Sequence, residues 1–203
     1  PVVSYASPAL VAIGQAKYRN DPPGNPLSNL IRKLSVSRTL RVLQRMQPSS
    51  GGFLEAIPLT SFVVMGLSCS GHADHPVVEN GLRFIRDSVR SEGSWPIDTN
   101  LATWNTSLSI SALSQTLAPD HTSTSKTRGA HDRRELLNEM YQPELLDWLL
   151  GCQNLDRHPF TGAKPGGWGW SDLSGAVPDA DDTPGALLAL RYWADYANPD
   201  GAT

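Results

Sequence analysis

The chain has 203 residues, of which 39% are hydrophobic, so it is long enough to form a folded domain with a buried core. Its 17 basic and 20 acidic residues give a net charge of −3, and no long run of Lys or Arg predicts binding to nucleic acid. Cys69 and Cys152 lie far apart and lack the spacing of a zinc site, so we expect no metal and a reducing, cytoplasmic location.

The N-terminal third alternates apolar runs with turn residues. Residues 2–13 are rich in Ala and Val, and we expect a buried helix with Pro8 near its start. Residues 27–46 place Leu, Ile and Val among Arg and Lys, which predicts an amphipathic pair of helical pieces. A turn over residues 47–53 then ends on an aromatic residue.

Two different helix types follow that turn. Residues 60–70 are small and apolar all round, so we expect a helix that is buried on every side. Residues 74–89 are amphipathic and predict an outer helix, with Pro76 in its first turn and Asp74 or His75 as its cap. The apolar stripe predicted for this outer helix consists of Val78, Leu82, Ile85 and Val89.

The C-terminal half repeats the alternation. Residues 103–113 resemble the apolar inner helix, and residues 143–150 resemble the amphipathic outer helix. The polar stretch 119–141 between them predicts an exposed insertion. A last inner-type run covers residues 186–193.

A glycine and an aromatic residue close each turn: Gly52-Phe53, Gly93-Ser94-Trp95 and Gly167-Trp168. We interpret the chain as about three copies of a unit of turn, inner helix and outer helix. Such hairpins bury their inner faces by stacking on neighbours, which gives a solenoid or a closed ring. The predicted fold is therefore all-α, with helical repeats that belong to an α/α barrel.

Two motifs carry a family resemblance. Gln47 before Gly51-Gly52-Phe53, and Gln153 before Gly167-Trp168, resemble the QW repeats of triterpene cyclases. The sequence DADDT at residues 179–183 resembles the DxDD motif of squalene-hopene cyclases and other class II terpene cyclases. The resemblance implies an isomerase without a cofactor, which protonates squalene or another linear polyprene and drives its carbocationic polycyclisation.

The residues themselves fit such chemistry. Three crowded carboxyl groups cannot all ionise, so we expect Asp179 or Asp182 to be the anion and Asp181 to keep the proton. The resemblance also implies that Asp181 is the general acid. Aromatic faces stabilise a carbocation, and our candidates are Trp170, by its match to the family, and Trp104. Trp168 is assigned to the repeat turn.

Several features point to a longer protein. The chain begins at Pro1, and it contains no histidine after His158, whereas the resemblance implies a histidine on a later repeat that orients the acid. We therefore expect an internal portion of a cyclase, an incomplete barrel that is inactive alone. The resemblance also implies that the parent protein contacts the membrane surface as a monotopic protein, for which residues 2–13 are a candidate. The oligomeric state stays open.

Other functions also fit the pattern. Three acids before a helix are often a solvated helix cap without catalytic function. The repeats could form a scaffold that binds a lipid or a protein without chemistry, and an α/α-barrel glycosidase would use paired carboxyl groups beside tryptophans.

Overall fold

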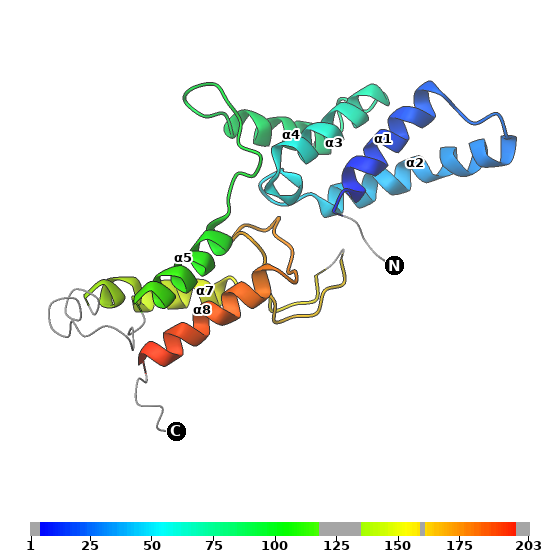
Figure 1. Cartoon of the computed structure of the whole chain (residues 1–203). Coiled ribbons are helices and arrows are strands. Elements are labelled where there is room, and N and C mark those ends of the chain that lie inside the picture. Colours follow the sequence, from blue (N-terminus) through cyan, green and yellow to red (C-terminus); the bar gives the residue numbers. More distant parts are fainter. Residues whose placement is uncertain (1–4, 118–134, 159–160, 198–203) are drawn as a thin grey trace. The chain divides into compact units, whose positions relative to one another are not determined.

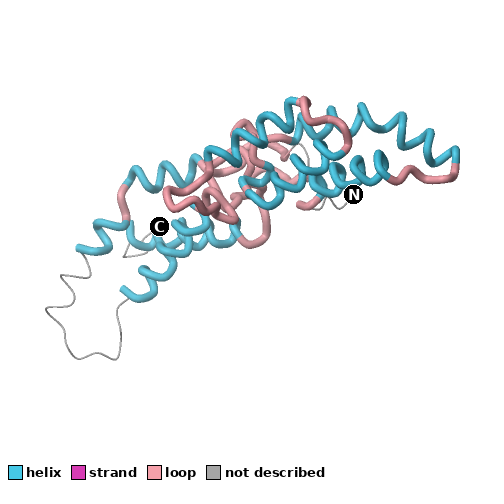
Figure 2. The backbone as a smooth tube through the Cα atoms, turned by 90° about the horizontal axis from the view of Figure 1, so that it is seen from above, coloured by secondary structure: helices cyan, strands magenta, loops and turns pink. Residues whose placement is uncertain are grey.

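The computed structural model describes residues 5–117, 135–158 and 161–197. Within these ranges the regular structure is helical and contains no strand, as Figure 2 shows, so the predicted all-α class is confirmed. The chain forms two compact units, which are described separately. Unit 1 comprises Pro1–Asn100 and Leu173–Ala176, and unit 2 comprises Leu101–Asp172 and Val177–Thr203.

Unit 1 contains four α-helices and a short 3₁₀ turn: α1 (Ser7–Asn20), α2 (Pro26–Met46), η1 (Phe53–Glu55), α3 (Ile57–Cys69) and α4 (Pro76–Asp87). Each α-helix of this unit has a proline in its first turn, where the missing N–H group has no helical partner to lose. Figure 1 shows α1 and α2 as a hairpin, with α1 alongside α3.

The helix starts largely follow local sequence signals. The imidazole of His75 accepts a hydrogen bond from the Val77 N–H at 3.3 Å, so this predicted cap of α4 is confirmed, as is Pro76 in its first turn. The prediction of two helical pieces over residues 27–46 is wrong, because α2 is continuous. No Gly or Pro interrupts this stretch, so nothing stops the helix once Asn25 has capped it.

The core of unit 1 lies where α1, α3 and α4 meet. Helix α3 approaches α1 closely at Gly66 and Ala12, since a Cβ atom added at Gly66 would lie 2.7 Å from the Ala12 carbonyl carbon. A glycine is therefore required for the two helices to pack at this distance. The buried apolar residues of this core are Ala9, Ala12, Leu40, Leu43, Phe53, Val63, Val64, Leu67, Val77 and Val78.

The expectation that residues 60–70 are buried on every side is wrong. Val63 and Leu67 are fully buried against the core, but Phe62 and Met65 are about half exposed. The neighbouring helices α1 and α4 cover one side of α3 and leave its other side open to solvent. Uniform hydrophobicity indicated a helix here without indicating how many sides have partners.

The buried stripe of α4 also differs from the prediction. Val78 is buried and Ile85 is partly buried, but Leu82 and Val89 are exposed. The core side of α4 is formed by Val77, Val78, Gly81 and Phe84. Phe84 covers Gly52 so closely that a Cβ atom there would lie 2.3 Å from its ring. The core side of α4 therefore shares only Val78 with the predicted stripe as a buried residue.

Unit 2 is built from α5 (Ala102–Leu117), α7 (Pro143–Gly151) and α8 (Asp182–Ala197). In Figure 1, α5 lies along α8, and the two helices approach through small residues. A Cβ atom at Gly185 of α8 would lie 3.7 Å from the Cβ atom of Ser107 of α5. The buried core of unit 2 consists of Ile110, Tyr141, Leu149, Trp168, Ala186, Ala189 and Trp193.

The predicted insertion 119–141 falls mostly on residues 118–134, which lie outside the described residues. Its C-terminal end is part of the fold, because residues 135–140 are helical and Tyr141 is buried. The Tyr141 ring stacks on Tyr196 at 4.4 Å and meets Trp193 edge-on at 5.0 Å. Residues 135–140 are exposed or partly exposed, so among the described residues of the predicted insertion only Tyr141, the last one, departs from the expected exposure.

Candidate functional site

The acid motif leads into the N-terminus of α8, which begins at Asp182. One oxygen of Asp179, Oδ1, accepts hydrogen bonds from the backbone N–H groups of Asp181 at 2.9 Å and Asp182 at 2.8 Å. This is the geometry of a helix cap, in which a carboxylate satisfies N–H groups that have no partner in the helix. Asp179 therefore fits the anionic role, one of the two alternatives that the sequence left open.

Asp182 is the buried member of the triad, with only 4% of its surface exposed. Burial raises the pKa of its carboxyl group from 3.8 to about 7, and the charge of Asp179, a hydrogen bond with Asp179 and the charge of Asp181 add to the effect. Its Oδ1 atom makes no hydrogen bond to the residues that the structure describes. Near neutral pH, Asp182 therefore holds a proton in a large fraction of molecules.

Asp181 has a different environment from its two neighbours. Its side chain is exposed, whereas that of Asp179 is half-buried and that of Asp182 is buried. The three predicted catalytic residues thus lie in one helical turn, but their surroundings separate them into a capping anion, a proton holder and a group that is open to solvent. Such a division of environments within a carboxyl cluster is typical of acid–base sites.

Trp168 connects the acid motif to the preceding turn. Its indole Nε1 donates to the Leu149 carbonyl oxygen at 2.7 Å, which satisfies a carbonyl at the end of α7. Its backbone N–H donates to Thr183 Oγ1 at 3.0 Å, and the Thr183 hydroxyl donates back to the Trp168 carbonyl at 3.2 Å. The indole is fully buried in the core of unit 2, so the structure places Trp168 in the turn, as expected.

The glycines before Trp168 make this connection possible. Gly166 has φ of +103°, a left-handed conformation that favours glycine. A Cβ atom at Gly167 would lie 2.9 Å from Thr183 Oγ1 and 3.0 Å from the Cβ atom of Pro178. The turn can therefore pack against the acid motif only without a side chain at position 167.

The two predicted substrate-binding tryptophans are joined through the backbone. The N–H group of Trp104, near the start of α5, donates to the Trp170 carbonyl oxygen at 3.1 Å. Trp104 is partly exposed, and Trp170 is half-buried. Both belong to unit 2, the unit that also contains the three acids. The structure thus brings the two candidates together at the start of α5.

The turns at Phe53 and Trp168 each contain the same two kinds of hydrogen bond. The Gln47 amide donates to the Gly51 carbonyl oxygen at 3.0 Å, and the Gln153 amide makes the same bond to Gly166 at 2.9 Å. Gln47 also donates to the Val77 carbonyl oxygen at 3.0 Å, and so connects its turn to the start of α4.

The second shared bond holds the aromatic residue to the next helix. The Phe53 N–H donates to Thr60 Oγ1 at 2.9 Å, as the Trp168 N–H does to Thr183 Oγ1. Both aromatic rings are buried. The turn at Trp95, which has no glutamine at the matching place, differs, because the Trp95 ring is half exposed and donates to the Ile85 carbonyl oxygen at 2.8 Å.

Glu55 is a buried acid that the sequence analysis missed. Its Oε1 atom accepts hydrogen bonds from Ser50 Oγ at 2.9 Å and from the Gly175 N–H at 3.1 Å, within unit 1. Burial raises the pKa of its carboxyl group, and the hydrogen bonds from Ser50 and Gly175 oppose the shift. The only sequence signal for a buried acid was that Glu55 is flanked by apolar residues. This signal does not distinguish a buried glutamate from one on the surface.

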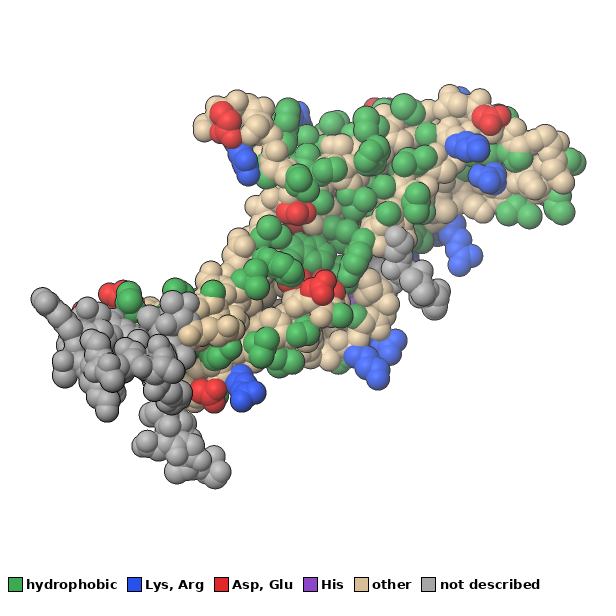
Figure 3. All heavy atoms as spheres, viewed as in Figure 1, with side chains coloured by type: hydrophobic (Ala, Val, Ile, Leu, Met, Phe, Trp, Pro, Cys, Tyr) green, Lys and Arg blue, Asp and Glu red, His purple; other side chains and the backbone are tan. Residues whose placement is uncertain are grey.

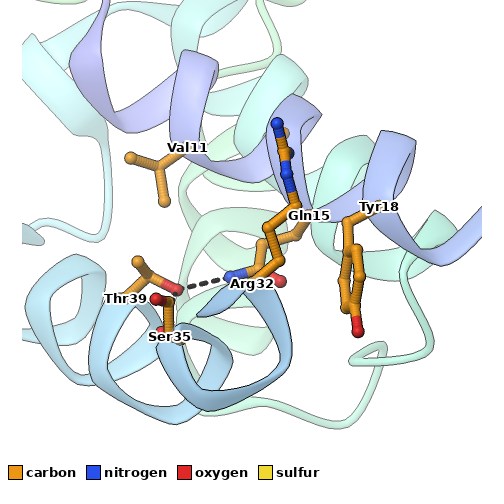
Figure 4. A pocket seen from close by; sticks show the side chains of 7 residues that line it. Val11, Gln15, Tyr18, Arg32, Ser35 and Thr39 are labelled. Atoms are coloured by element: carbon orange, nitrogen blue, oxygen red, sulfur yellow. Dashed lines mark hydrogen bonds between the residues drawn. The ribbon is translucent and has the colours of Figure 1, made fainter. Parts of the chain in front are cut away.

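A cavity of about 180 Å³ lies between α1 and α2 of unit 1. Figure 4 shows Gln15 of α1 reaching toward Thr39 of α2, where its amide donates to the hydroxyl, with Tyr18 and Arg32 nearby. The lining contains no carboxyl or imidazole group, so this cavity offers no acid for catalysis.

Among the described residues, no cluster of three or more His, Cys, Asp or Glu side chains could hold a metal ion. In the same part of the chain, no helix combines the length and the apolar character needed to cross a membrane. The sequence matches no protein-family model, no curated protein and no solved structure at a significant level.

Proposed function

We propose that this chain is the acid-bearing portion of a class II terpene cyclase of the squalene-hopene type. It would protonate squalene or another linear polyprene and start a carbocationic polycyclisation, which is an isomerase reaction. The observation that carries the proposal is the first turn of α8, where Asp179 caps the helix, buried Asp182 holds a proton near neutral pH and Asp181 is exposed.

The proton transfer needs a strong acid, because an isolated carbon–carbon double bond is a far weaker base than the carboxylate of an ordinary acid with a pKa of about 4. In this proposal Asp181 is the donor, since its carboxyl group is the accessible one of the three. Its O–H bond breaks, a C–H bond forms at one alkene carbon, the other carbon becomes the cation, and Asp181 is left as a carboxylate. A neutral Asp182 limits the negative charge beside the donor.

The cation that forms needs a negative surface that does not react with it. Trp170 and Trp104, which the backbone hydrogen bond brings together, would supply the faces of their indole rings. Loss of a proton from the final cation balances the proton that started the reaction, so the net change is an isomerisation. The proposal therefore assigns no cofactor or metal to the reaction.

We further propose that the helices belong to an α/α barrel with QW-type turns. The matching hydrogen bonds of Gln47 and Gln153, and of Phe53 and Trp168, support an internal repeat. The rest of the barrel would come from a longer cytoplasmic protein that takes its substrate from the membrane surface.

Analysis of the products formed by the full-length natural protein tests this proposal. With squalene as substrate and gas chromatography as readout, we expect cyclic triterpene from the natural protein and at least a hundredfold less from Asp181→Asn, the range over which a general acid contributes. The matched control is Asp147→Asn, which removes an exposed carboxyl group of α7 and should leave the yield unchanged. Undiminished cyclisation by Asp181→Asn would refute the assignment.

The isolated 203-residue chain provides a second test, because we expect it to form no cyclic product. Cyclic product from this chain alone would contradict the proposal that the remainder of the cavity comes from elsewhere in the protein.

A further inference from the structure

Glu55 is a buried acid to which the proposed function gives no role. Figure 3 shows acidic side chains on the surface, whereas among the described residues only Glu55 and Asp182 are buried acids. None of the surface of Glu55 is exposed to solvent. A carboxyl group is rarely enclosed in this way unless it has fixed hydrogen-bond partners, so its contacts indicate what it does.

The backbone around Glu55 is held in an unusual conformation. Leu54 and Glu55 have φ of +55° and +54°, the left-handed region that residues other than glycine rarely adopt. The Glu55 carbonyl oxygen accepts hydrogen bonds from the Thr99 N–H at 3.0 Å and from the Thr99 hydroxyl at 3.1 Å. Its N–H group donates to the Gly52 carbonyl oxygen at 3.1 Å. These contacts fix a strained turn, and such strain is concentrated at functional sites.

The buried carboxyl group holds a segment that is distant in the sequence. Its Oε1 atom accepts hydrogen bonds from the Gly175 N–H at 3.1 Å and from Ser50 Oγ at 2.9 Å. A Cβ atom at Gly175 would lie 2.5 Å from Oε1, so only glycine allows this approach. Ser174 adds a second contact, since its hydroxyl oxygen lies 2.9 Å from that of Ser49. Residues 173–176 thus belong to unit 1, although the residues before and after them belong to unit 2.

This segment leads directly into the acid motif. Residues 176–178 alone separate Gly175 from Asp179, where the motif starts. The first two of them are buried, and the third is a proline, whose ring restricts the backbone. The Asp179 N–H donates to the Trp168 carbonyl oxygen at 3.3 Å, so the chain is also held where the motif begins. A connection this short and this restricted transmits the position of Gly175 to the acid motif.

We propose that Glu55 is a positioning residue for the proton transfer, because it holds Gly175 and thereby fixes the start of the acid motif. Glu55 does not touch the substrate, and Asp181 is still the proton donor. The inference rests on the proposed function, since that reaction is what depends on the place of Asp181. A side-chain carbonyl oxygen can accept the same two hydrogen bonds, so glutamine should replace Glu55 in this role and leucine should not.

Steady-state kinetics of the full-length natural protein with squalene test this role. We expect Glu55→Leu to lower kcat about tenfold or more with little change in KM, because the acid is displaced and the substrate contacts are not. Glu55→Gln should keep about half of the natural kcat or more. The matched control is Glu79→Leu, which replaces an exposed glutamate of the same unit and should leave both constants unchanged. A natural kcat in Glu55→Leu would overturn the proposal.

Two further variants separate positioning from a loss of stability. Ser50→Ala removes the other hydrogen bond of the same carboxyl group, so it should weaken the protein in urea but keep the natural kcat. Gly175→Ala leaves Glu55 in place and adds a methyl group where Oε1 lies, so it should lower kcat even if Glu55→Leu does not fold. Equal losses of kcat in Ser50→Ala and Gly175→Ala would show a general effect of stability and would refute the assignment.

Titration of Asp182, followed by carbon NMR of its carboxyl group, tests the same hold without any substrate. The natural chain should titrate with a pKa of about 7. In Glu55→Leu the loosened motif admits water, so the pKa of Asp182 should fall by about one pH unit or more toward its ordinary value. An Asp182 pKa that Glu55→Leu leaves unchanged would overturn the proposal. If the natural protein cyclises no squalene, the proposed function fails, and this titration still decides whether Glu55 fixes the acid motif.

Discussion

The acid motif makes a quantitative prediction for the pH dependence of stability. The pKa of Asp182 is about 7 in the folded chain against 3.8 for an ordinary aspartate, so the folded state binds this proton more tightly than the unfolded state. The resulting stabilisation is complete below pH 3.8 and is lost as the pH rises to about 7. The shift sets a ceiling of about 4 kcal/mol. Because water screens the neighbouring charges, we expect about half of that, or about 2 kcal/mol.

The assay is unfolding in urea, followed by tryptophan fluorescence between pH 4.5 and pH 8. Five of the six tryptophans, all except Trp95, belong to unit 2, so the signal reports mainly on the unit with the acid motif. The free energy of unfolding should fall by about 2 kcal/mol over this range in the natural chain. Asp182→Asn, which is neutral at every pH, should remove most of the decrease.

Two controls separate this effect from others of the same sign. Asp147→Asn removes an exposed carboxyl group of unit 2 and should leave the slope unchanged. Glu55→Gln removes the buried acid of unit 1, whose raised pKa also lowers stability as the pH rises, and it should change the profile of unit 1 only. A natural chain with constant stability, or an Asp182→Asn variant with the full decrease, would refute the assignment of the proton to Asp182.

Further predictions concern single contacts and are measured by urea unfolding. Trp168→Phe keeps an aromatic ring but loses the hydrogen bond to the end of α7, which should cost about 1–2 kcal/mol. Gly66→Ala should destabilise unit 1 by about 1–3 kcal/mol because its Cβ atom would collide with α1. Gly14→Ala, which has no atom within 4 Å of the added carbon, should instead stabilise α1 by up to about 1 kcal/mol, and the opposite order would contradict this packing. Gln47→Ala should cost more than Gln153→Ala, because Gln47 also holds the start of α4, and equal costs would show that this bond contributes nothing.

Local signals were sufficient to predict the presence and type of most helices. Pro76 and His75 correctly indicated the start of α4, because capping involves groups within a few residues of each other. Residues 27–46 also read correctly as helical, although the expected interruption is not there. The start of a helix is determined by hydrogen bonds among residues that are close in sequence, so it can be recognised without knowledge of tertiary contacts.

The burial of individual helix faces could not be predicted in the same way. Leu82 and Leu30 have the spacing of core residues, but both are exposed. Periodicity shows that a helix has an apolar face, whereas only its neighbours decide whether that face is covered. The same reason explains why the uniformly apolar α3 leaves Phe62 and Met65 open to solvent.

The sequence by itself determined the all-α class and the grouping of Asp179, Asp181 and Asp182 in one turn, because both depend on short-range spacing. Only the tertiary structure decided that Asp179 caps the helix, that Asp182 holds the proton and that Asp181 is exposed. These differences arise from burial and from the direction of each side chain at the start of α8. Three identical residue types carry no such information until the fold gives each one its own surroundings.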